Sequence, residues 1–235
     1  MLLDCADLSY TRGSGDQTFR VAIESLTLDT GEIVALTGES GCGKSTALEL
    51  LGLVARPQHG GRFQLGVGDT PTDIADLWRR GRHRDLARLR AATIGFVLQT
   101  GGLLPYLSVA GNIGINRRLL RLPERDPDLD AIVAQLQIGH LLGQRPAQLS
   151  VGQYQRASIA RALAHRPRLV LADEPTSALD PRLGDEVMDL FLSLVERLGT
   201  SVILATHEHA RVRTRGLREV PAAPLADGFG SRFAG

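Results

Sequence analysis

Apolar and polar residues alternate near the start of the chain and then give way to short, continuous apolar runs. In residues 19–28 apolar side chains alternate with polar or small ones, which predicts a half-buried strand of an antiparallel sheet. The apolar positions of this stretch are Phe19, Val21, Ile23, Leu26 and Leu28. Residues 29–31, Asp-Thr-Gly, predict a turn, and the run at 33–36 predicts a buried strand.

The rest of the chain alternates between apolar runs and stretches with helical spacing. Residues 93–98, 169–172 and 201–205 are predicted as strands. A helix is predicted to begin after Asp180, with proline at its first position, and to end at Gly199. Several helical patterns between about residues 100 and 164 are interrupted by Pro105, Pro123, Pro127 and Pro146. Strands that alternate with helices predict an α/β chain with a mostly parallel sheet.

Composition and charge narrow the possible partners. With 235 residues and 43% hydrophobic content, the chain is long enough to bury a sizeable core. Its 27 basic and 26 acidic residues nearly cancel, so its overall charge gives no reason to expect nucleic acid as a ligand. No apolar run reaches the length of a membrane span and the start lacks the pattern of a secretory signal, so we expect a cytosolic location. The arginine-rich stretch 79–90 is interpreted as a solvated helix face.

One segment carries a phosphate-binding pattern. Residues 38–45 match G-x-x-x-x-G-K-[ST] and lie between a predicted strand and a predicted helix. The glycines allow successive backbone N–H groups to point at phosphate oxygens, and the helix amino terminus adds partial positive charge. Lys44 is expected to reach the β- and γ-phosphates and Ser45 to hold Mg²⁺. The predicted nucleotide-binding residues of this loop are Gly38, Glu39, Ser40, Gly41, Cys42, Gly43, Lys44, Ser45 and Thr46.

Two acidic residues end the apolar run at 169–172. Asp173 is in the position of a carboxylate that holds Mg²⁺. Glu174 follows it, and we predict that Glu174 is the general base that orients and deprotonates the attacking water. The sequence therefore predicts a nucleotide-hydrolysing site.

A further motif resembles a known family. Residues 149–153, Leu-Ser-Val-Gly-Gln, are similar to the LSGGQ signature of ATP-binding cassette (ABC) ATPases, and they precede Asp173 and Glu174 as in that family. The resemblance implies a P-loop NTPase fold with a mostly parallel core sheet, an N-terminal antiparallel β subdomain and an inserted α-helical subdomain at about 100–165. It also implies that residues 1–235 form a single nucleotide-binding domain.

The resemblance assigns further site residues. Gln99 resembles the glutamine that touches Mg²⁺ or water and relays the nucleotide state to a membrane partner. His207 resembles the switch histidine, which positions the reaction beside Lys44 and Glu174, and Tyr10 resembles the aromatic residue that stacks on adenine. Residues 177–180 resemble the D-loop. The nucleotide-binding positions implied outside the phosphate loop are Tyr10, Gln99, Ser150, Val151, Gly152, Gln153 and Asp180, and the Mg²⁺ ligands are Ser45, Gln99 and Asp173.

The family's mode of action implies partners. ATP is expected to lie between Lys44 of one copy and residues 150–153 of a second, so that two copies form a homodimer around two ATP molecules. The chain is further expected to bind an integral-membrane permease through a groove on the helical subdomain and thus to lie on the inner face of the cell membrane. Residues 94–99 and 172–176 are similar to the lipoprotein-release and macrolide-exporter branch of the family.

Two positions depart from the family pattern, and two alternatives stay open. Val151 replaces the first glycine of the signature, which removes access to positive φ, and Cys42 stands where serine or alanine is frequent. The alternatives are a non-transport cassette of the DNA-repair or translation type and a nucleotide-binding scaffold that does not hydrolyse. Intact Lys44, Asp173, Glu174 and His207 argue against a scaffold.

The only other cysteine, Cys5, is far from Cys42 in the sequence, so both are predicted to be reduced thiols.

Overall fold

The computed structural model describes all residues of the chain except 14–17, 69, 100–101, 124–125 and 227. The chain forms two compact units. The first comprises residues 1–90 and 201–235, and the second comprises residues 91–200. The second unit is therefore a single segment inserted into the first.

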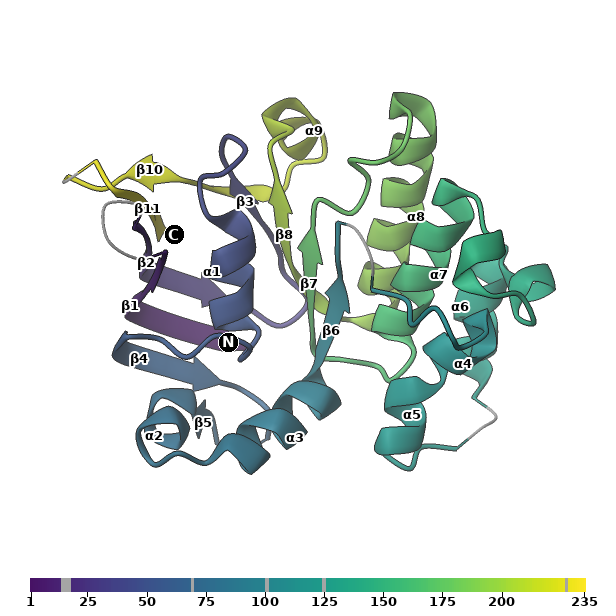
Figure 1. Ribbon diagram of the computed structural model, residues 1–235, viewed down its shortest axis with the longest axis horizontal. Helices are drawn as coiled ribbons and strands as arrows, with labels where there is room; N and C mark the ends of the chain where they lie inside the picture. The colour runs from purple at the N-terminus through teal and green to yellow at the C-terminus, as the bar shows by residue number, and fades with distance from the viewer. Residues whose placement is uncertain (14–17, 69, 100–101, 124–125, 227) are drawn as a thin grey trace. The chain divides into compact units, whose positions relative to one another are not determined.

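The first unit contains a six-stranded sheet with strand order β10-β11-β2-β1-β4-β5, in which the purple strands β1 and β2 of Figure 1 meet the yellow strands β10 and β11 from the other end of the chain. Its strands are β1 (Leu3–Arg12), β2 (Phe19–Leu28), β4 (His59–Leu65), β5 (Thr72–Asp73), β10 (Ala223–Pro224) and β11 (Gly230–Ala234). β1 pairs antiparallel with β2 and with β4, as residues 19–28 predicted. β11 pairs parallel with β2, so the sheet is mixed.

A change of phase in β1 and β2 explains why the sheet keeps one buried face. Leu3 and Cys5 are buried, Asp7 has a φ of +57°, and the next buried residue is Leu8. The opposite strand makes the same change, since both Glu24 and Ser25 are exposed there. Regular alternation alone would place the two halves of each strand on opposite faces.

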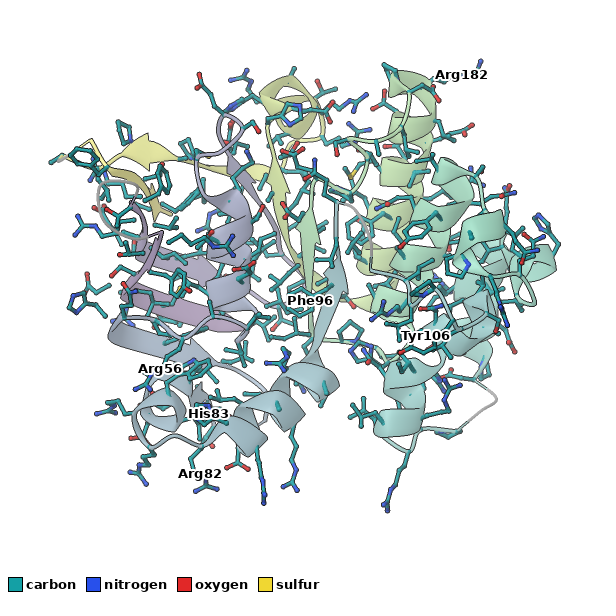
Figure 2. The ribbon with its side chains drawn as sticks, viewed as in Figure 1. Arg56, Arg82, His83, Phe96, Tyr106 and Arg182 are labelled. Atoms are coloured by element: carbon teal, nitrogen blue, oxygen red, sulfur yellow. The ribbon has the colours of Figure 1, made fainter. Side chains whose placement is uncertain are left out.

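The first unit also holds three parallel strands. β3 (Ile33–Thr37) lies between β8 (Ser201–Thr206) and β9 (Arg218–Pro221) and pairs parallel with both. The helices that begin in this unit are α1 (Lys44–Leu51), α2 (Ile74–Arg79), α3 (His83–Thr93) and α9 (His209–Thr214). The arginines of α2 and α3 are mostly exposed, and Arg82 points away from the fold in Figure 2, which agrees with a solvated face.

The second unit is mostly helical. Its parallel strands β6 (Ile94–Val97) and β7 (Leu169–Asp173) pair in register. Its helices are α4 (Val109–Ile113), α5 (Ile115–Leu119), α6 (Pro127–Gln135), α7 (Val151–Leu163) and α8 (Pro181–Leu198), with short 3₁₀ turns at Gly139–Leu141 and Pro146–Gln148. The described part of the predicted helical subdomain, about 100–165, contains helices and no strand. None of the described helices is long and apolar enough to cross a membrane.

The packing of α7 against β6 is close. A Cβ atom added at Gly95 of β6 would lie 2.3 Å from the carbonyl oxygen of Ala162 in α7. Glycine is therefore required at this position by contact with the helix backbone, because any larger residue would force the strand and helix apart.

Candidate functional site

The phosphate-loop pattern folds as a strand, a loop and a helix. β3 ends at Thr37, the loop follows, and α1 begins at Lys44. Gly41 and Gly43 have φ values of +83° and +89°, in the left-handed region that glycine adopts without strain. A Cβ atom at Gly43 would also lie 2.4 Å from Cγ2 of Val21 in β2. The second glycine of the pattern is therefore fixed both by its backbone angle and by contact with the sheet.

The lysine of the loop is held inside it. Lys44 is only 5% exposed, and its Nζ donates hydrogen bonds to the carbonyl oxygens of Gly38 at 2.8 Å and Glu39 at 2.9 Å. The loop therefore holds a positive charge beside the amino terminus of α1, an arrangement that favours phosphate. The Ser45 side chain is exposed at the start of the same helix. Cys42 is half-buried and is a free thiol, as is Cys5.

The predicted adenine-stacking residue lies on the face of the sheet that meets this loop. Tyr10 of β1 is the register partner of Val21, and directly opposite residues of paired strands share a face. Because Val21 contacts Gly43, Tyr10 lies on the same side of the sheet as the phosphate loop. The stacking role of Tyr10 stays a prediction.

The predicted switch histidine, His207, directly follows β8, the strand next to β3 in the first unit. Thr37 and Thr206 are register partners at the carboxyl ends of β3 and β8. The phosphate loop therefore starts beside the strand end that His207 follows. Ligands of parallel sheets bind at such carboxyl ends, so the register agrees with a joint action of the loop and His207.

In the second unit the structure brings together residues that are 75 positions apart. The β6–β7 register pairs Val97 with Ala172, and its continuation leads to Gln99 and Glu174. Gln99 Nε2 donates to Glu174 Oε2 at 3.3 Å and to Ser177 Oγ at 3.4 Å. Glu174, the first residue after β7, has a φ of +43°, in the left-handed region that residues other than glycine rarely adopt.

The signature segment forms a well-capped helix start. Ser150 Oγ accepts a hydrogen bond from Gln153 N at 3.3 Å, and Gln153 Oε1 accepts one from Ser150 N at 2.9 Å. Val151 is the first residue of α7, does not have a positive φ and is 58% exposed. The helix therefore forms with valine at its first position. The positive φ that a glycine would allow is not used.

Gly152 of the signature helix and Asp180 both lie at the start of α8. A Cβ atom at Gly152 would lie 2.9 Å from Cδ2 of Leu183, so the second glycine of the motif is set by packing. Asp180 is the N-cap of α8, as predicted, and accepts a hydrogen bond from Leu183 N at 3.1 Å.

The predicted site residues thus fall into two groups. Tyr10, residues 38–46 and His207 belong to the first unit, whereas Gln99, residues 150–153, Asp173, Glu174 and Asp180 belong to the second. The proposed Mg²⁺ ligands, Ser45, Gln99 and Asp173, supply the oxygen donors that this ion prefers. No group of three His, Cys, Asp or Glu residues forms a protein-only metal site among the described residues.

The buried position of Asn112 could not be predicted from the sequence, in which a surface asparagine is equally plausible. Asn112 is completely buried in α4. Its Oδ1 accepts from Leu104 N at 2.6 Å, and its Nδ2 donates to the carbonyl oxygens of Leu104, Leu107 and Ser108 at 3.1, 3.3 and 3.1 Å. This side chain holds residues 104–108 ahead of α4, and only the structure reveals its contacts.

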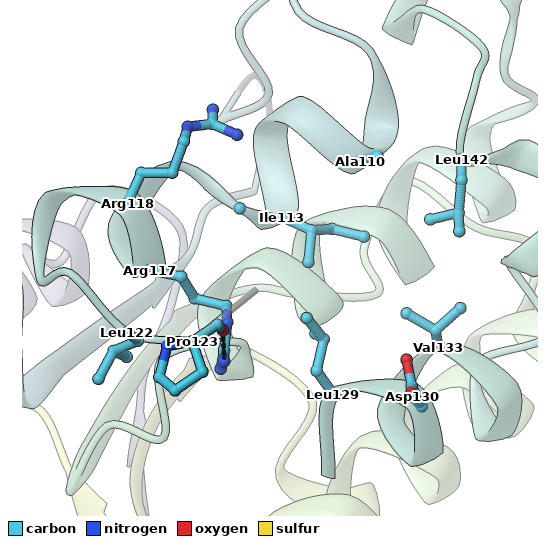
Figure 3. Close-up of a pocket in the computed structure, with 11 residues that line it drawn as sticks. Ala110, Ile113, Arg117, Arg118, Leu122, Pro123, Leu129, Asp130, Val133 and Leu142 are labelled. Atoms are coloured by element: carbon cyan, nitrogen blue, oxygen red, sulfur yellow. Dashed lines mark hydrogen bonds between the residues drawn. The ribbon is translucent and has the colours of Figure 1, made fainter. Parts of the chain in front are cut away.

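The helical part of the second unit contains an apolar pocket of about 370 Å³. Figure 3 shows Ile113, Leu129, Val133 and Leu142 pointing toward one another around it, with Asp130 beside Val133 and Arg118 extending away at the rim. Arg117 forms part of the wall and is tied to Asp126 by an ion pair of 2.8 Å. A concave apolar surface on this subdomain agrees with the expected groove.

Comparisons with known proteins agree with these observations. The ABC transporter family profile matches residues 22–177. The macrolide export ATP-binding/permease protein MacB of Brucella melitensis is 40% identical over 210 residues, which is 88% of this chain and 31% of that protein. The lipoprotein-releasing system ATP-binding protein LolD of Cereibacter sphaeroides is 36% identical over 88% of this chain and 89% of its own length. The chain therefore spans about a third of MacB and most of LolD.

Solved structures give the same result. The dimeric ATP-binding cassette MJ0796, in a post-hydrolysis state bound to ADP and Pi, matches with a TM-score of 0.78 and 28% identity, covering 99% of this chain and 96% of that one. The cassette cbiO1 of Clostridium perfringens, part of the transporter complex cbiONQ, matches with a TM-score of 0.70, 29% identity and coverage of 88% and 78%.

Proposed function

Because this chain belongs to the ABC transporter family, we propose that it is an ATPase subunit that closes on a second copy of itself around ATP and thereby drives a membrane permease. The observation that carries the proposal is the β6–β7 register that sets Gln99 Nε2 3.3 Å from Glu174 Oε2. In the proposal Gln99 reports on a partner and Glu174 activates water, and the hydrogen bond between the two side chains supports it. Neither the non-transport cassette nor the non-hydrolysing scaffold is favoured by any of the similarities.

The reaction we propose is attack of water on the γ-phosphorus of ATP. Glu174 accepts a proton from the water as its oxygen bonds to phosphorus, and the bond between that phosphorus and the ADP oxygen breaks. Lys44 and the loop amides bind the phosphate oxygens, and His207 donates a hydrogen bond that keeps the γ-phosphate or the water in position. Mg²⁺, held by Ser45 and Asp173 with Gln99 nearby, would neutralise part of the phosphate charge.

We propose that Ser150, Gly152 and Gln153 of one copy cover the ATP bound by Lys44 of the other. The position of this segment at the amino terminus of α7 supports this, because the partial positive charge of a helix amino terminus favours an anion. The dimeric state of the MJ0796 cassettes supports a homodimer. Tyr10 is proposed to stack on the adenine.

We further propose a permease helix as the occupant of the apolar pocket between α4 and α6. An amphipathic helix placed in an apolar groove is a common mode of recognition, and Arg118 and Asp130 offer charges of both signs at its side. The LolD relative, matched over 89% of its length, supports a permease on a separate chain. The subunit would then lie against the cytoplasmic face of the membrane, and the transported substrate would be selected by the permease.

Phosphate release at saturating ATP tests the ATPase proposal. We expect Glu174→Gln to lower turnover by at least about 100-fold, the usual contribution of a general base, while ATP still drives dimer formation. Glu186→Gln, on an exposed carboxyl of α8, is the control and should retain wild-type turnover. Equal turnover of the wild type and Glu174→Gln, or no phosphate release by the wild type, would refute the proposal.

A further inference from the structure

One carboxylate in the first unit joins the start of the phosphate loop to the segment that carries His207. Oε1 of Glu219, in β9, accepts a hydrogen bond from Thr37 Oγ1 at 2.8 Å and contacts His209 Nδ1 at 2.5 Å. Thr37 is fully buried and is the last residue of β3 before the loop. His209 is the first residue of α9, two positions after His207.

The strand order makes this bridge possible. β3 lies between β8 and β9, and Thr37 has Thr206 of β8 and Pro221 of β9 as its register partners. Residues beyond the end of β8 therefore pass close to the end of β3, where the side chain of Glu219 reaches both. The backbone supports the same junction, since Ala222 N donates to Thr37 O at 2.7 Å.

The segment around His207 is held on both sides. Glu208 N donates to Thr206 Oγ1 at 3.1 Å, and His209 N donates to His207 O at 3.2 Å. Arg211 Nη1 donates to both carboxylate oxygens of Glu208 at 2.6 and 2.7 Å. His207 thus lies between Thr206, at the end of β8, and Glu208, which is bonded to Thr206 and Arg211. The next residue, His209, is held by its contact with Glu219.

Glu219 carries the charge that this bridge needs. The hydroxyl of Thr37 and, next, the imidazole of His209 lower the pKa of its carboxyl, with a smaller contribution from Arg213. The carboxylate is therefore ionised at neutral pH, and its side chain is only 22% exposed. A charge-assisted hydrogen bond in a partly buried place is stronger than an ordinary surface contact.

We propose that Glu219 is a positioning residue that holds His207 in register with the phosphate loop. The inference rests on the proposed function, in which both act on the same γ-phosphate. Glu219 does not touch ATP in this scheme. Its loss would leave Lys44 and the loop amides in place, so that ATP still binds, but His207 would no longer be fixed relative to the phosphate.

The test compares Glu219→Ala with Glu219→Gln and a matched control. We expect kcat for ATP hydrolysis to fall about tenfold in Glu219→Ala with KM changed less than about twofold, since misplacement of a reacting group lowers the rate but not the binding. Glu219→Gln keeps an acceptor oxygen and should remain within about threefold of the wild type. Adding His209→Ala to Glu219→Ala should cost nothing further, because both changes break one contact.

The control is Glu32→Ala. Glu32 pairs with Arg218, the neighbour of Glu219 in β9, at 2.8 Å, but it lies at the opposite end of β3 from the loop. Its removal should leave kcat unchanged. An equal fall in kcat for Glu32→Ala, or a kcat for Glu219→Ala within about twofold of the wild type, would overturn the inference.

A second measurement does not require activity. Amide hydrogen exchange of the nucleotide-free protein should be faster in Glu219→Ala than in Glu32→Ala at residues 207–211, where the anchored segment opens more easily. Unchanged exchange there would overturn the inference even if the protein hydrolyses ATP. If the wild type releases no phosphate but exchange responds as expected, the proposed function fails while the contact itself stands.

Discussion

The backbone at Glu174 adopts a φ of +43°, a conformation that costs a residue other than glycine about 1 kcal/mol or more. The surrounding structure holds it there through Ser177, whose amide and hydroxyl both donate to Glu174 O, at 3.2 and 3.1 Å. The positive φ follows the end of β7 at Asp173 and begins the turn that Ser177 closes. Asp173 thus ends the strand while Glu174 belongs to the turn, and the two are proposed to act on different targets, Mg²⁺ and the attacking water.

His165 gives a prediction about acid stability. It is 4% exposed, and burial lowers its pKa from 6.5 to about 4. Between these pH values the unfolded chain binds a proton at His165 and the folded chain does not, so stability present above pH 6.5 is lost as the pH falls. We expect the free energy of unfolding to decrease by about 2 kcal/mol between pH 7.5 and pH 5 through this residue.

Urea unfolding at the two pH values measures this loss. His165→Gln should remove most of the His165 contribution, whereas His140→Gln, at an exposed position, should leave the wild-type dependence unchanged. The same slope in wild type and His165→Gln would contradict the prediction.

At the scale of elements, the strands that carry the site could be predicted because each is a short apolar run followed by polar residues. The runs at 33–36, 93–98, 169–172 and 201–205 correspond to β3, β6, β7 and β8. The sequence does not predict β1, because the phase change at Asp7 breaks the alternation of apolar and polar residues. It does not predict β4 either, because His59 is followed by two glycines and the strand has no regular alternation there. Periodicity fails where long-range pairing, rather than the local sequence, decides the structure.

A substitution at Asn112 tests whether its side chain holds residues 104–108 in place. Asn112→Ala removes the acceptor of Leu104 N and leaves buried polar groups without a partner, so we expect it to lower the free energy of unfolding by about 2–3 kcal/mol. Asn116→Ala, one helix further on, should change it by less than about 0.5 kcal/mol. Chemical denaturation of both variants measures the difference. Equal stabilities would show that the Asn112 contacts are not important.

The pocket between α4 and α6 tests the permease proposal. Val133→Asp places a charge among apolar side chains that would receive the partner helix. We expect the variant to lose co-purification with the permease by at least about tenfold while it keeps its own ATP hydrolysis. Leu119→Asp is the control, because Leu119 is 67% exposed on the neighbouring helix and does not line the pocket. Undiminished binding by Val133→Asp would exclude this groove as the site.

At the scale of the whole molecule, the order of motifs predicted the family and the chemistry, which the comparisons confirm. It could not predict which residues would meet. The contact of Gln99 with Glu174 depends on strand register, and the bridge at Glu219 joins residues 37, 209 and 219, none of which belongs to a motif. A single sequence does not reveal a hydrogen bond between residues that are far apart in the chain and belong to no motif.

The proposed ATP site is divided between two copies of the chain, which predicts a dependence on concentration. Specific ATPase activity should rise with protein concentration, since only dimers hold a complete site, and should level off when dimers dominate. Lys44→Ala should remain monomeric with ATP in light scattering, because the phosphate that joins the copies is no longer bound. Activity per milligram that stays constant over a wide dilution range would be inconsistent with a shared site.

The glycine at position 95 has a mechanical consequence. Because the backbones of β6 and α7 approach closely at Gly95 and Ala162, there is no room for a side chain between them at this point. We therefore expect helix α7, which begins at Val151, and the strand that leads to Gln99 to move together. A displacement of the signature end of α7 should therefore also displace β6 and Gln99, and a displacement of Gln99 should reach the signature segment.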